Sequence, residues 1–539
     1  MYDKLLQRIE SKQKQVVIIF FTLFFVLSIA GLKDYGLSWD EGIQWKANGE
    51  VAATYAAHPN AETRQVLLNS LEKYHGPAFE IVLIFFEKVF QLEDSRAVYL
   101  MRHAITFLTF FTAVIFFYFL GKRIFKSWKL ALTGCIFLVL SPRIFADSFY
   151  NSKDIPFLSF FLVSMYALLL FHEQPSYKNA LVYAIVSAFT IDIRIVGIIL
   201  PLISLVFFST DLLRAFLYKQ RHTTYLKIFI LYSVSLILFT ILFWPVLWNS
   251  PVYYFSKAWE EMSQYTWPGT ILYKGTFMKA TTHPWHYLPV WIGITTPLPY
   301  LFLFFAGLFF MLQEYWKKPL SFIFYRKDLQ LMAACSVVTI LIIILLKSTV
   351  YDGWRHVYFI YPAFTLIVLY GLRSIYTLLK KYKSFVISGL VFIILFNLLQ
   401  LFRLHPHEYV YFNRLAGKDM AAVKEKFDLD YYGVSSKEVL EYILKNDSSS
   451  SIKIFPELIP QRLNIQFLPV SQRNRVKLVS LKDADYFIGQ YRFHKGEYTF
   501  KNKCFSVMIG NASIMSVFKL TEEERTNNSL HISTGIQNN

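Results

Sequence analysis

The first long apolar run of the chain, Val16–Leu32 (VVIIFFTLFFVLSIAGL), is followed within a few residues by the acidic stretch Ser38-Trp39-Asp40-Glu41-Gly42. An apolar run of this length predicts a helix that spans a membrane. The residues before it are basic (Lys4, Arg8, Lys12 and Lys14), which favours a cytoplasmic N-terminus and places Asp40 on the opposite surface. No small-residue cleavage site follows the run, so we expect a retained helix.

The composition indicates that the membrane contains much of the chain. Of the 539 residues, 55% are hydrophobic and 18% are aromatic, and the mean hydropathy is +0.38. A soluble protein with this apolar content would need an unusually large core, whereas repeated apolar runs of about 20 residues are typical of membrane helices. The three cysteines, Cys135, Cys335 and Cys504, form no disulfide framework.

Ten further apolar runs predict a polytopic α-helical membrane protein with about 11 transmembrane helices. They lie near residues 97–120, 130–145, 155–171, 180–191, 195–208, 228–247, 287–312, 331–346, 357–372 and 385–402. The loops that this order places in the cytoplasm hold most of the basic residues, among them Lys122, Arg123, Arg214, Lys219, Lys317, Lys318, Lys380 and Lys381. This asymmetry follows the positive-inside rule. It accounts for the net charge of +18 without a nucleic acid partner.

The polar and apolar segments predict four regions. Residues 1–15 form a cytoplasmic N-terminus, and residues 16–403 form the membrane domain with a large first outer loop at 33–95. Residues 404–523 form a small extracytoplasmic α/β domain, because alternating runs typical of strands at 451–455, 476–478, 485–488 and 513–520 follow a helical pattern at 436–445. Residues 524–539 are expected to be disordered. Between 180 and 208, Asp192 and Arg194 mark either a tight outer turn or an interruption in one long helix.

Two acidic positions on the predicted outer surface are candidates for proton transfer. Asp40, with Glu41 beside it, lies where a carboxylate can take the proton of an attacking hydroxyl, although the pair also suits a helix start or a solvated loop. Asp154 lies in the next outer turn, which also contains Arg143 and Lys153. Asp154 precedes Ile155-Pro156, so a helix N-cap is an equally good interpretation of it.

The outer turns also carry cations suited to a phosphate. Arg194, Arg355 and His356 can each bind a phosphate through charge-assisted hydrogen bonds, and Tyr351–His356, which includes Asp352, is the densest of these turns. Ionisable residues near membrane depth usually mark sites or pathways. A snorkelling anchor at the interface remains the alternative for Arg355.

Histidines on the outer side leave a metal site open. His283 and His286 are three residues apart, and His405 and His407 add further candidates, but the spacing fixes no third ligand. Sugar stacking on Trp285 beside His286 is at least as good an interpretation. The sequence specifies no cofactor, and a divalent metal stays open.

These motifs resemble the glycosyltransferase C superfamily, in particular the branch of protein-O-mannosyltransferases and the aminoarabinose–lipid A transferase. The resemblance covers roughly residues 15–435. It depends on Trp39-Asp40-Glu41-Gly42 after the first span and on Lys153-Asp154-Ile155-Pro156 in an outer turn. The segments 351–356, 409–413 and 430–433 are consistent with it. His75-Gly76-Pro77 resembles the family's His-Pro-Pro segment, with Gly76 in place of the first proline.

The resemblance implies an enzyme that transfers a sugar from a polyprenyl-phosphate carrier, usually with inversion, to an acceptor on the non-cytoplasmic face. Asp40 would be the general base, with Glu41 beside it, and Asp154 the second functional acid. The residues that would hold the donor phosphate and substrate are Arg143, Lys153, Arg194, Asp352, Arg355, His356, His75, Trp285 and His286. The partners would be the donor, a lipid, glycan or protein acceptor, and membrane lipid.

Two other functions fit parts of the sequence. A transporter or flippase for a lipid-linked or anionic substrate would also need many spans, but transporters usually carry polar residues near the bilayer midplane and show repeated halves. Here the ionisable residues cluster at one surface and no repeat is visible. A non-catalytic scaffold gives no reason for acids and cations to converge from several loops. The charge pattern fits a multi-pass protein of the bacterial cytoplasmic membrane whose active site faces outward, and it would also suit an enzyme of the endoplasmic reticulum that faces the lumen.

Overall fold

The computed structural model describes residues 12–219, 223–263, 267–493 and 495–526. Most of the predicted cytoplasmic segment 1–15, and all but the first three residues of the predicted tail 524–539, lie outside these residues. Those three residues belong to a short helix, α26 (Glu522–Thr526).

The described residues contain nine helices that are long and apolar enough to cross a membrane. They are built on α2 (Gln13–Gly31), α7 (Ser95–Phe125), α10 (Asp154–Glu173), α12 (Ile199–Leu217), α13 (Thr223–Phe243), α16 (Leu298–Lys317), α18 and α19 (Lys327–Ala333 and Thr339–Leu345), α20 (Tyr361–Leu378) and α21 (Lys383–Leu404). The pair α8 (Trp128–Val139) and α9 (Pro142–Tyr150) makes a tenth if its 69° bend belongs to one span. The shorter α11 (Tyr177–Ile193) matches the remaining predicted run. The predicted polytopic membrane fold is confirmed.

Two predicted runs contain breaks with local causes. Arg194 is extended between α11 and the 3-10 turn Ile195–Ile198, so the ambiguous region is a break between two helices and not one long helix. The run 287–312 divides into α15 (Tyr287–Thr295) and α16, because Thr296 and Pro297 adopt extended dihedral angles. Proline removes a backbone donor and fixes its own φ, so a helix ends readily before it.

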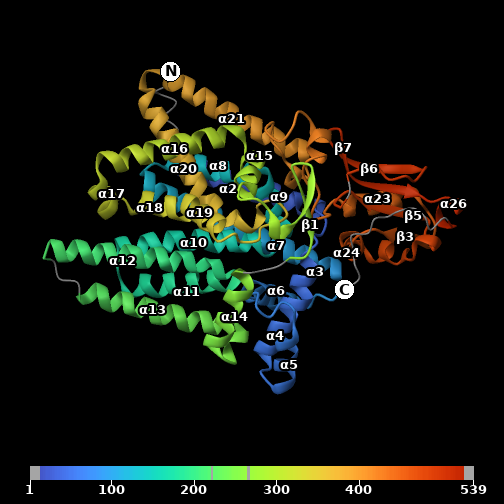
Figure 1. Cartoon of the computed structure of the whole chain (residues 1–539), viewed down its shortest axis with the longest axis horizontal. Coiled ribbons are helices and arrows are strands. Elements are labelled where there is room, and N and C mark those ends of the chain that lie inside the picture. Colours follow the sequence, from blue (N-terminus) through green and yellow to red (C-terminus); the bar gives the residue numbers. More distant parts are fainter. Residues whose placement is uncertain (1–11, 220–222, 264–266, 494, 527–539) are drawn as a thin grey trace.

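The spans differ in how much protein surrounds them. α10 and α20 are the most buried, whereas α2 and α21 expose most of their apolar side chains. On α21, Phe385, Phe392 and Phe402 are all exposed, as expected of side chains that face lipid tails. Figure 1 shows α21 along one edge of the bundle. The two central helices therefore provide the most rigid positions for a site at their ends.

Short helices make up the first outer loop. They are α3 (Glu41–Ile43), a π-helical segment (Gln44–Glu50), α4 (Val51–Ala57), α5 (Ala61–Asn69) and α6 (Ala78–Val89). α5 ends at Asn69, because Ser70 is extended and its amide donates to the Val66 and Leu67 carbonyls in the last turn of the helix. The long loop between α13 and α15 contains α14 (Pro251–Ser263) and a hairpin, β1 (Thr270–Tyr273) and β2 (Thr276–Lys279), which the sequence analysis missed.

The C-terminal domain is a mixed five-stranded sheet at one end of the bundle (Figure 1). Its strand order is β4-β3-β5-β7-β6, with β3 (Ile452–Pro456) parallel to β4 (Val476–Leu478) and β5 (Tyr486–Gln490), and β7 (Ala512–Lys519) antiparallel to β5 and β6 (Lys503–Ile509). The helices of this domain are α23 (Ser436–Asn446), α24 (Ile459–Ile465) and α25 (Val470–Arg473). Two short helices lie elsewhere in the sequence: α17 (Pro319–Tyr325), between α16 and α18, and α22 (Met420–Lys424), before α23. The small α/β domain is confirmed, with β6 as an added strand.

Candidate active site

Arg355 joins three outer segments of the chain. Its side chain is almost fully buried at the start of the 3-10 turn Arg355–Ile360, which leads into α20. Nη1 donates to Asp40 Oδ2 at 2.7 Å and to Asp154 Oδ2 at 3.3 Å, and Nη2 donates to Asp352 Oδ2 at 3.4 Å. Three of the predicted acidic residues therefore surround one predicted cation. Arg355 is a structural hub, which excludes the alternative of a snorkelling anchor.

Asp154 is held for ion pairing rather than for capping its helix. It is the first residue of α10, and the Asn151 side chain accepts its backbone N–H at 2.8 Å. Asn151 Nδ2 donates to Asp154 Oδ2 at 3.0 Å and to the Tyr432 hydroxyl at 2.7 Å. The other oxygen, Oδ1, pairs with Arg194. Because the Asn151 side chain binds the first backbone N–H of α10, the Asp154 carboxylate is not used there, and both of its oxygens bind cations.

Asp40 is the accessible acid of this group. Its side chain is 35% exposed, against 1% for Asp154 and 6% for Asp352. It stands at the N-cap position of α3 but makes no side-chain capping bond there. The turn before it is fixed from another segment, since the Trp39 N–H donates to the Tyr432 carbonyl at 3.1 Å. Only Asp40 combines a held orientation with access for a second reactant.

Glu41 points into the protein. Its Oε2 accepts the Ser38 N–H at 2.7 Å, its Oε1 pairs with His103 Nε2 at 2.8 Å, and its side chain is 2% exposed. These contacts tie the Asp40 turn to α7. They give Glu41 a structural role, and its predicted part in catalysis stays a prediction.

A cationic edge lies next to Asp154. Lys153 Nζ is 3.9 Å from Glu72 Oε2, and His75 Nδ1 is 2.9 Å from the same oxygen. Burial lowers the pKa of the Lys153 ammonium to about 8, although Glu72 and Asp40 act to raise it. Burial acts to raise the pKa of the Glu72 carboxyl, but the hydrogen bond from His75 and the charge of Lys153 lower it to about 2. Burial and the Lys153 charge lower the pKa of His75.

The His75-Gly76-Pro77 segment needs glycine because it contacts the end of α11. A Cβ on Gly76 would lie 1.5 Å from the Asp192 carbonyl oxygen, which no side chain tolerates. The Ala78 N–H donates to Asp192 Oδ1 at 2.6 Å and fixes the segment there. This departure from the family's His-Pro-Pro pattern therefore has a packing cause.

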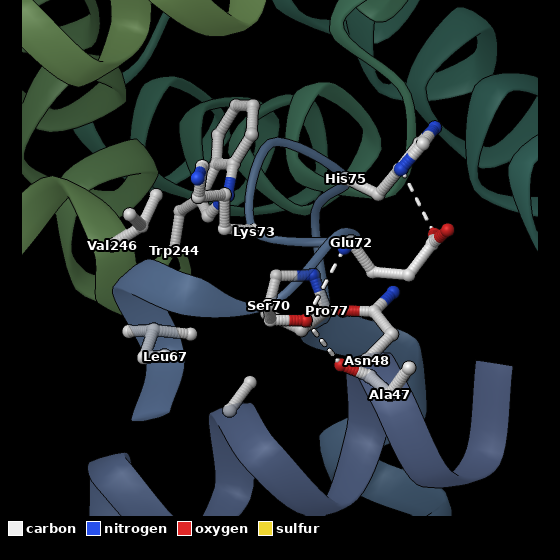
Figure 2. Close-up of a pocket in the computed structure, with 11 residues that line it drawn as sticks. Ala47, Asn48, Leu67, Ser70, Glu72, Lys73, His75, Pro77, Trp244 and Val246 are labelled. Carbon is white, nitrogen blue, oxygen red and sulfur yellow. Dashed lines mark hydrogen bonds and ion pairs between the residues drawn. The ribbon is translucent and has the colours of Figure 1, made fainter. Parts of the chain in front are cut away.

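Figure 2 shows the residues that line a small cavity next to Glu72 and His75. It is lined by Ala47, Asn48, Ala52, Leu67, Ser70, Glu72, Lys73, His75, Pro77, Trp244 and Val246. The cavity has room for roughly one water molecule. The cavity is therefore too small to hold a sugar.

Several predicted site residues lie outside the Arg355 network. Arg143 is buried, with its guanidinium over the rings of Phe412 and Trp291 and its Nε donating to the Tyr411 carbonyl. Trp285 is 71% exposed. His356 follows Arg355 directly, and its ring contacts Tyr351 edge-on at 4.5 Å between centroids. His356 therefore borders the network, whereas among the described residues no hydrogen bond or ion pair joins Arg143 or Trp285 to Asp40.

The four candidate metal ligands bind separate partners. His283 Nε2 accepts the Val350 N–H, His286 is hydrogen-bonded to the Tyr273 hydroxyl, His405 pairs with Asp34 and Glu408, and His407 pairs with Glu438. Within the described residues no three His, Cys, Asp or Glu side chains are arranged to hold a metal ion. The donor sets at these histidines do not fit a shared metal.

The sequence analysis missed four residues of the site: Glu72, Asn151, Tyr432 and Arg492. Asn151 carried a signal, because an asparagine side chain in a turn often accepts the N–H two residues later, as Asn151 does from Lys153. Arg492 follows β5 and reaches Asp352 across 140 residues of sequence, with Nη2 2.7 Å from Asp352 Oδ1. Nothing near Arg492 in the sequence marks it.

Comparisons with known proteins agree with this architecture. A family model described as dolichyl-phosphate-mannose-protein mannosyltransferase matches residues 74–248. A comparison of the sequence with curated proteins finds no significant match. The fold is similar to the crystal structure of ArnT from Cupriavidus metallidurans in the apo state, with a TM-score of 0.50 and 11% identity over 94% of this chain and 98% of that chain.

A second structure of the same ArnT, bound to undecaprenyl phosphate, matches with a TM-score of 0.48 and 11% identity over 93% of this chain and 98% of that chain. The matched segment 74–248 includes His75, Lys153, Asp154 and Arg194. The predicted resemblance to the glycosyltransferase C superfamily is confirmed by the family model for residues 74–248, and the likeness to ArnT shows a shared fold over almost the whole chain.

Proposed function

We propose that this protein is a membrane glycosyltransferase that moves a sugar from a polyprenyl-phosphate carrier to a hydroxyl of its acceptor, with inversion. The observation that carries the proposal is the Asp40 carboxylate, partly exposed and held at 2.7 Å by the buried Arg355. The family model, described by a dolichyl-phosphate-mannose donor, supports a carrier of this class.

The chemistry needs one base and several cations. Asp40 takes the proton of the acceptor hydroxyl as its oxygen attacks the anomeric carbon from the face opposite the phosphate. The bond between the anomeric carbon and the phosphate oxygen breaks, and its electrons leave with the polyprenyl phosphate. Lys153 and Arg194, with His75 and His356 nearby, would stabilise the charge that develops on this phosphate. Attack from the opposite face inverts the anomeric configuration.

The position of the site suits a substrate whose tail stays in the bilayer. Asp154 and Arg355 stand at the first turns of α10 and of the segment leading into α20, the two most buried spans. The opposite ends of the spans carry the basic clusters that include Lys122, Arg123, Arg326 and Lys327. By the positive-inside rule this charge pattern supports a bacterial cytoplasmic membrane with the site facing outward.

The test compares purified wild-type protein with Asp40→Asn on a panel of radiolabelled polyprenyl-phosphate sugars, with membrane extract as the source of acceptor. Release of polyprenyl phosphate is measured. Removal of a general base typically costs about 100- to 10,000-fold, so we expect a loss of at least about 100-fold. Asp34→Asn is the matched control, because Asp34 lies in the same loop and pairs with His405 instead of Arg355.

Two outcomes would contradict the proposal. Normal transfer by Asp40→Asn would remove Asp40 from its role as base. Binding of donors without release from any of them would favour a transporter, and movement of the lipid in proteoliposomes without covalent transfer would establish that alternative. The sugar and the acceptor, whether lipid, glycan or protein, would be identified from the radiolabelled products.

A further inference from the structure

Arg492 is a buried cation of the C-terminal domain that reaches the candidate active site. It follows β5, and its side chain is 4% exposed. Nη2 donates to Asp352 Oδ1 at 2.7 Å, and Nη1 donates to the Tyr431 carbonyl. Its guanidinium lies 5.1 Å from the ring centre of Trp39 and 5.6 Å from that of Trp267. Trp39 directly precedes Asp40, so Arg492 contacts the site from two sides.

Asp352 connects Arg492 to Arg355. One carboxylate oxygen accepts from Arg492, and the other accepts from Arg355 Nη2 at 3.4 Å. Asp352 has a φ of +53° and precedes Gly353 at +75°, so this turn is in the left-handed region, which is uncommon for a residue with a side chain. Such a conformation persists only where the surroundings determine it. Two arginines on one buried carboxylate provide that constraint.

The backbone from which the Arg492 side chain extends is itself held in place. Gln490, the last residue of β5, pairs with Met515 of β7, and its N–H donates to Glu457 Oε2 at 2.7 Å. Gln490 Nε2 donates to the Asp430 carbonyl at 2.5 Å. The sheet therefore holds the backbone two residues before Arg492. The guanidinium projects from a fixed support onto the turn at residues 351–356.

We infer that Arg492 is a positioning residue for the active site and that the C-terminal domain completes that site. Arg492 holds Asp352, Asp352 holds Arg355, and Arg355 holds Asp40 in one continuous series of charge-assisted hydrogen bonds. Bonds of this kind are stronger than neutral ones, and the bond between Arg355 and Asp352, at 3.4 Å, is the longest of the three. Arg492 contacts neither donor nor acceptor in this scheme. The inference rests on the proposed transferase function, because Asp40 is its endpoint.

The test uses full-length protein with Arg492→Met, Arg492→Lys and the control Arg475→Met. Arg475 belongs to the same domain, but its guanidinium donates only to the carbonyls of Leu444, Asp447 and Ser449. A displacement of about 1 Å in a catalytic constellation costs about 100-fold, so we expect kcat for Arg492→Met to fall roughly 10- to 100-fold with KM for the donor little changed. Arg492→Lys, which keeps the charge, should recover part of kcat, and Arg475→Met should retain it.

A double-mutant cycle separates positioning from general support of the fold. If Arg492 acts through Asp352, Arg492→Met combined with Asp352→Asn loses no more activity than the more impaired single variant. If the two residues act independently, their fold-losses multiply, and the inference is overturned. A wild-type kcat for Arg492→Met would overturn it as well.

Hydrogen exchange tests the structural step without any substrate. Peptides that cover residues 350–356 should exchange faster in Arg492→Met than in wild type and unchanged in Arg475→Met. Unchanged exchange in Arg492→Met would show that Arg492 does not hold the turn. Faster exchange in Arg492→Met, together with a wild-type protein that releases no polyprenyl phosphate, would contradict the proposed transferase function and leave the positioning step intact, so the two failures are distinguishable.

Discussion

At the scale of single residues, the cations of the site differ in how far the protein already neutralises them. Arg355 faces three carboxylates and Arg194 pairs with Asp154, whereas the nearest carboxylate oxygen to Lys153 Nζ is that of Glu72, 3.9 Å away. A cation that is less fully paired has more of its charge available to a phosphate. Lys153 is therefore the residue of the cationic edge whose protonation should be visible in the rate.

The pH dependence of transfer tests this assignment. Burial lowers the pKa of Lys153 to about 8, so Lys153 is charged below that pH and loses its charge as the pH rises through it. We expect kcat/KM for the donor to fall above pH 8 in wild type. Lys153→Arg keeps its charge throughout, so its basic limb should move to a higher pH. Lys153→Met should have a lower kcat/KM at pH 7 and lack this limb.

The measurement is kcat/KM between pH 6 and 10, with thermal unfolding recorded at each pH to separate lost activity from lost structure. The donor's phosphate diester has no proton to lose in this range, so the limb reports on the enzyme. A Lys153→Arg variant that keeps its limb near pH 8 would assign the titration to another group.

At the scale of elements, α21 is attached to the bundle mainly through its C-terminal end. Most of its length is exposed, and Asn397 and Leu401 are its buried residues. Directly after it, His405 pairs with Asp34 at the end of the first span and with Glu408. The Glu408 carboxylate also accepts a hydrogen bond from Tyr35 at 3.0 Å. One histidine thus connects the outer ends of the first and last spans.

This connection predicts a pH-dependent stability. The hydrogen bond to Glu408 is the main cause that raises the pKa of His405, to about 9, against the opposing effect of burial. Because the folded pKa exceeds the unfolded value near 6.5, the stabilisation is fully present below about pH 6.5 and is lost as the pH rises through 9. The difference in Tm between wild type and His405→Gln should therefore be largest at pH 6 and shrink above pH 9.

The control for this prediction is His58→Gln, since His58 is exposed in the first outer loop. Its Tm should follow that of wild type at every pH in detergent. A Tm difference for His405→Gln that stays constant from pH 6 to pH 10 would mean that the histidine acts by packing alone.

At the scale of the whole molecule, the sequence predicted which loops lie on the same side of the membrane, but it did not predict the contacts between distant segments. Alternation of apolar runs with basic loops placed Asp40, Asp154, Arg194 and Arg355 at the same surface, because each added span reverses the side. The structure joins all four in one network. Glu72 and Arg492 join it through tertiary contacts that leave no local pattern. Strand β6 was missed because much of it is exposed.

The C-terminal domain also holds the backbone that leads to Asp40. Asn464 is fully buried, and its Oδ1 accepts the Leu37 N–H at 2.8 Å while its Nδ2 donates to the Leu37 carbonyl at 2.9 Å. A Cβ on Gly36 would lie 2.4 Å from the Val434 carbonyl oxygen, so the domain and the loop are in close contact there. Asn464 therefore fixes the chain three residues before the proposed base.

We predict that Asn464→Ala lowers both stability and transfer. It leaves the buried N–H and carbonyl of Leu37 without their partners, and each unsatisfied group costs about 1–3 kcal/mol. We expect a lower Tm in detergent and a lower kcat, since Asp40 follows the loosened segment. Asn446→Ala is the control, because the exposed Asn446 bonds only within α23, to the Tyr442 carbonyl. A lower Tm with a wild-type kcat would show that the domain stabilises the protein without positioning Asp40.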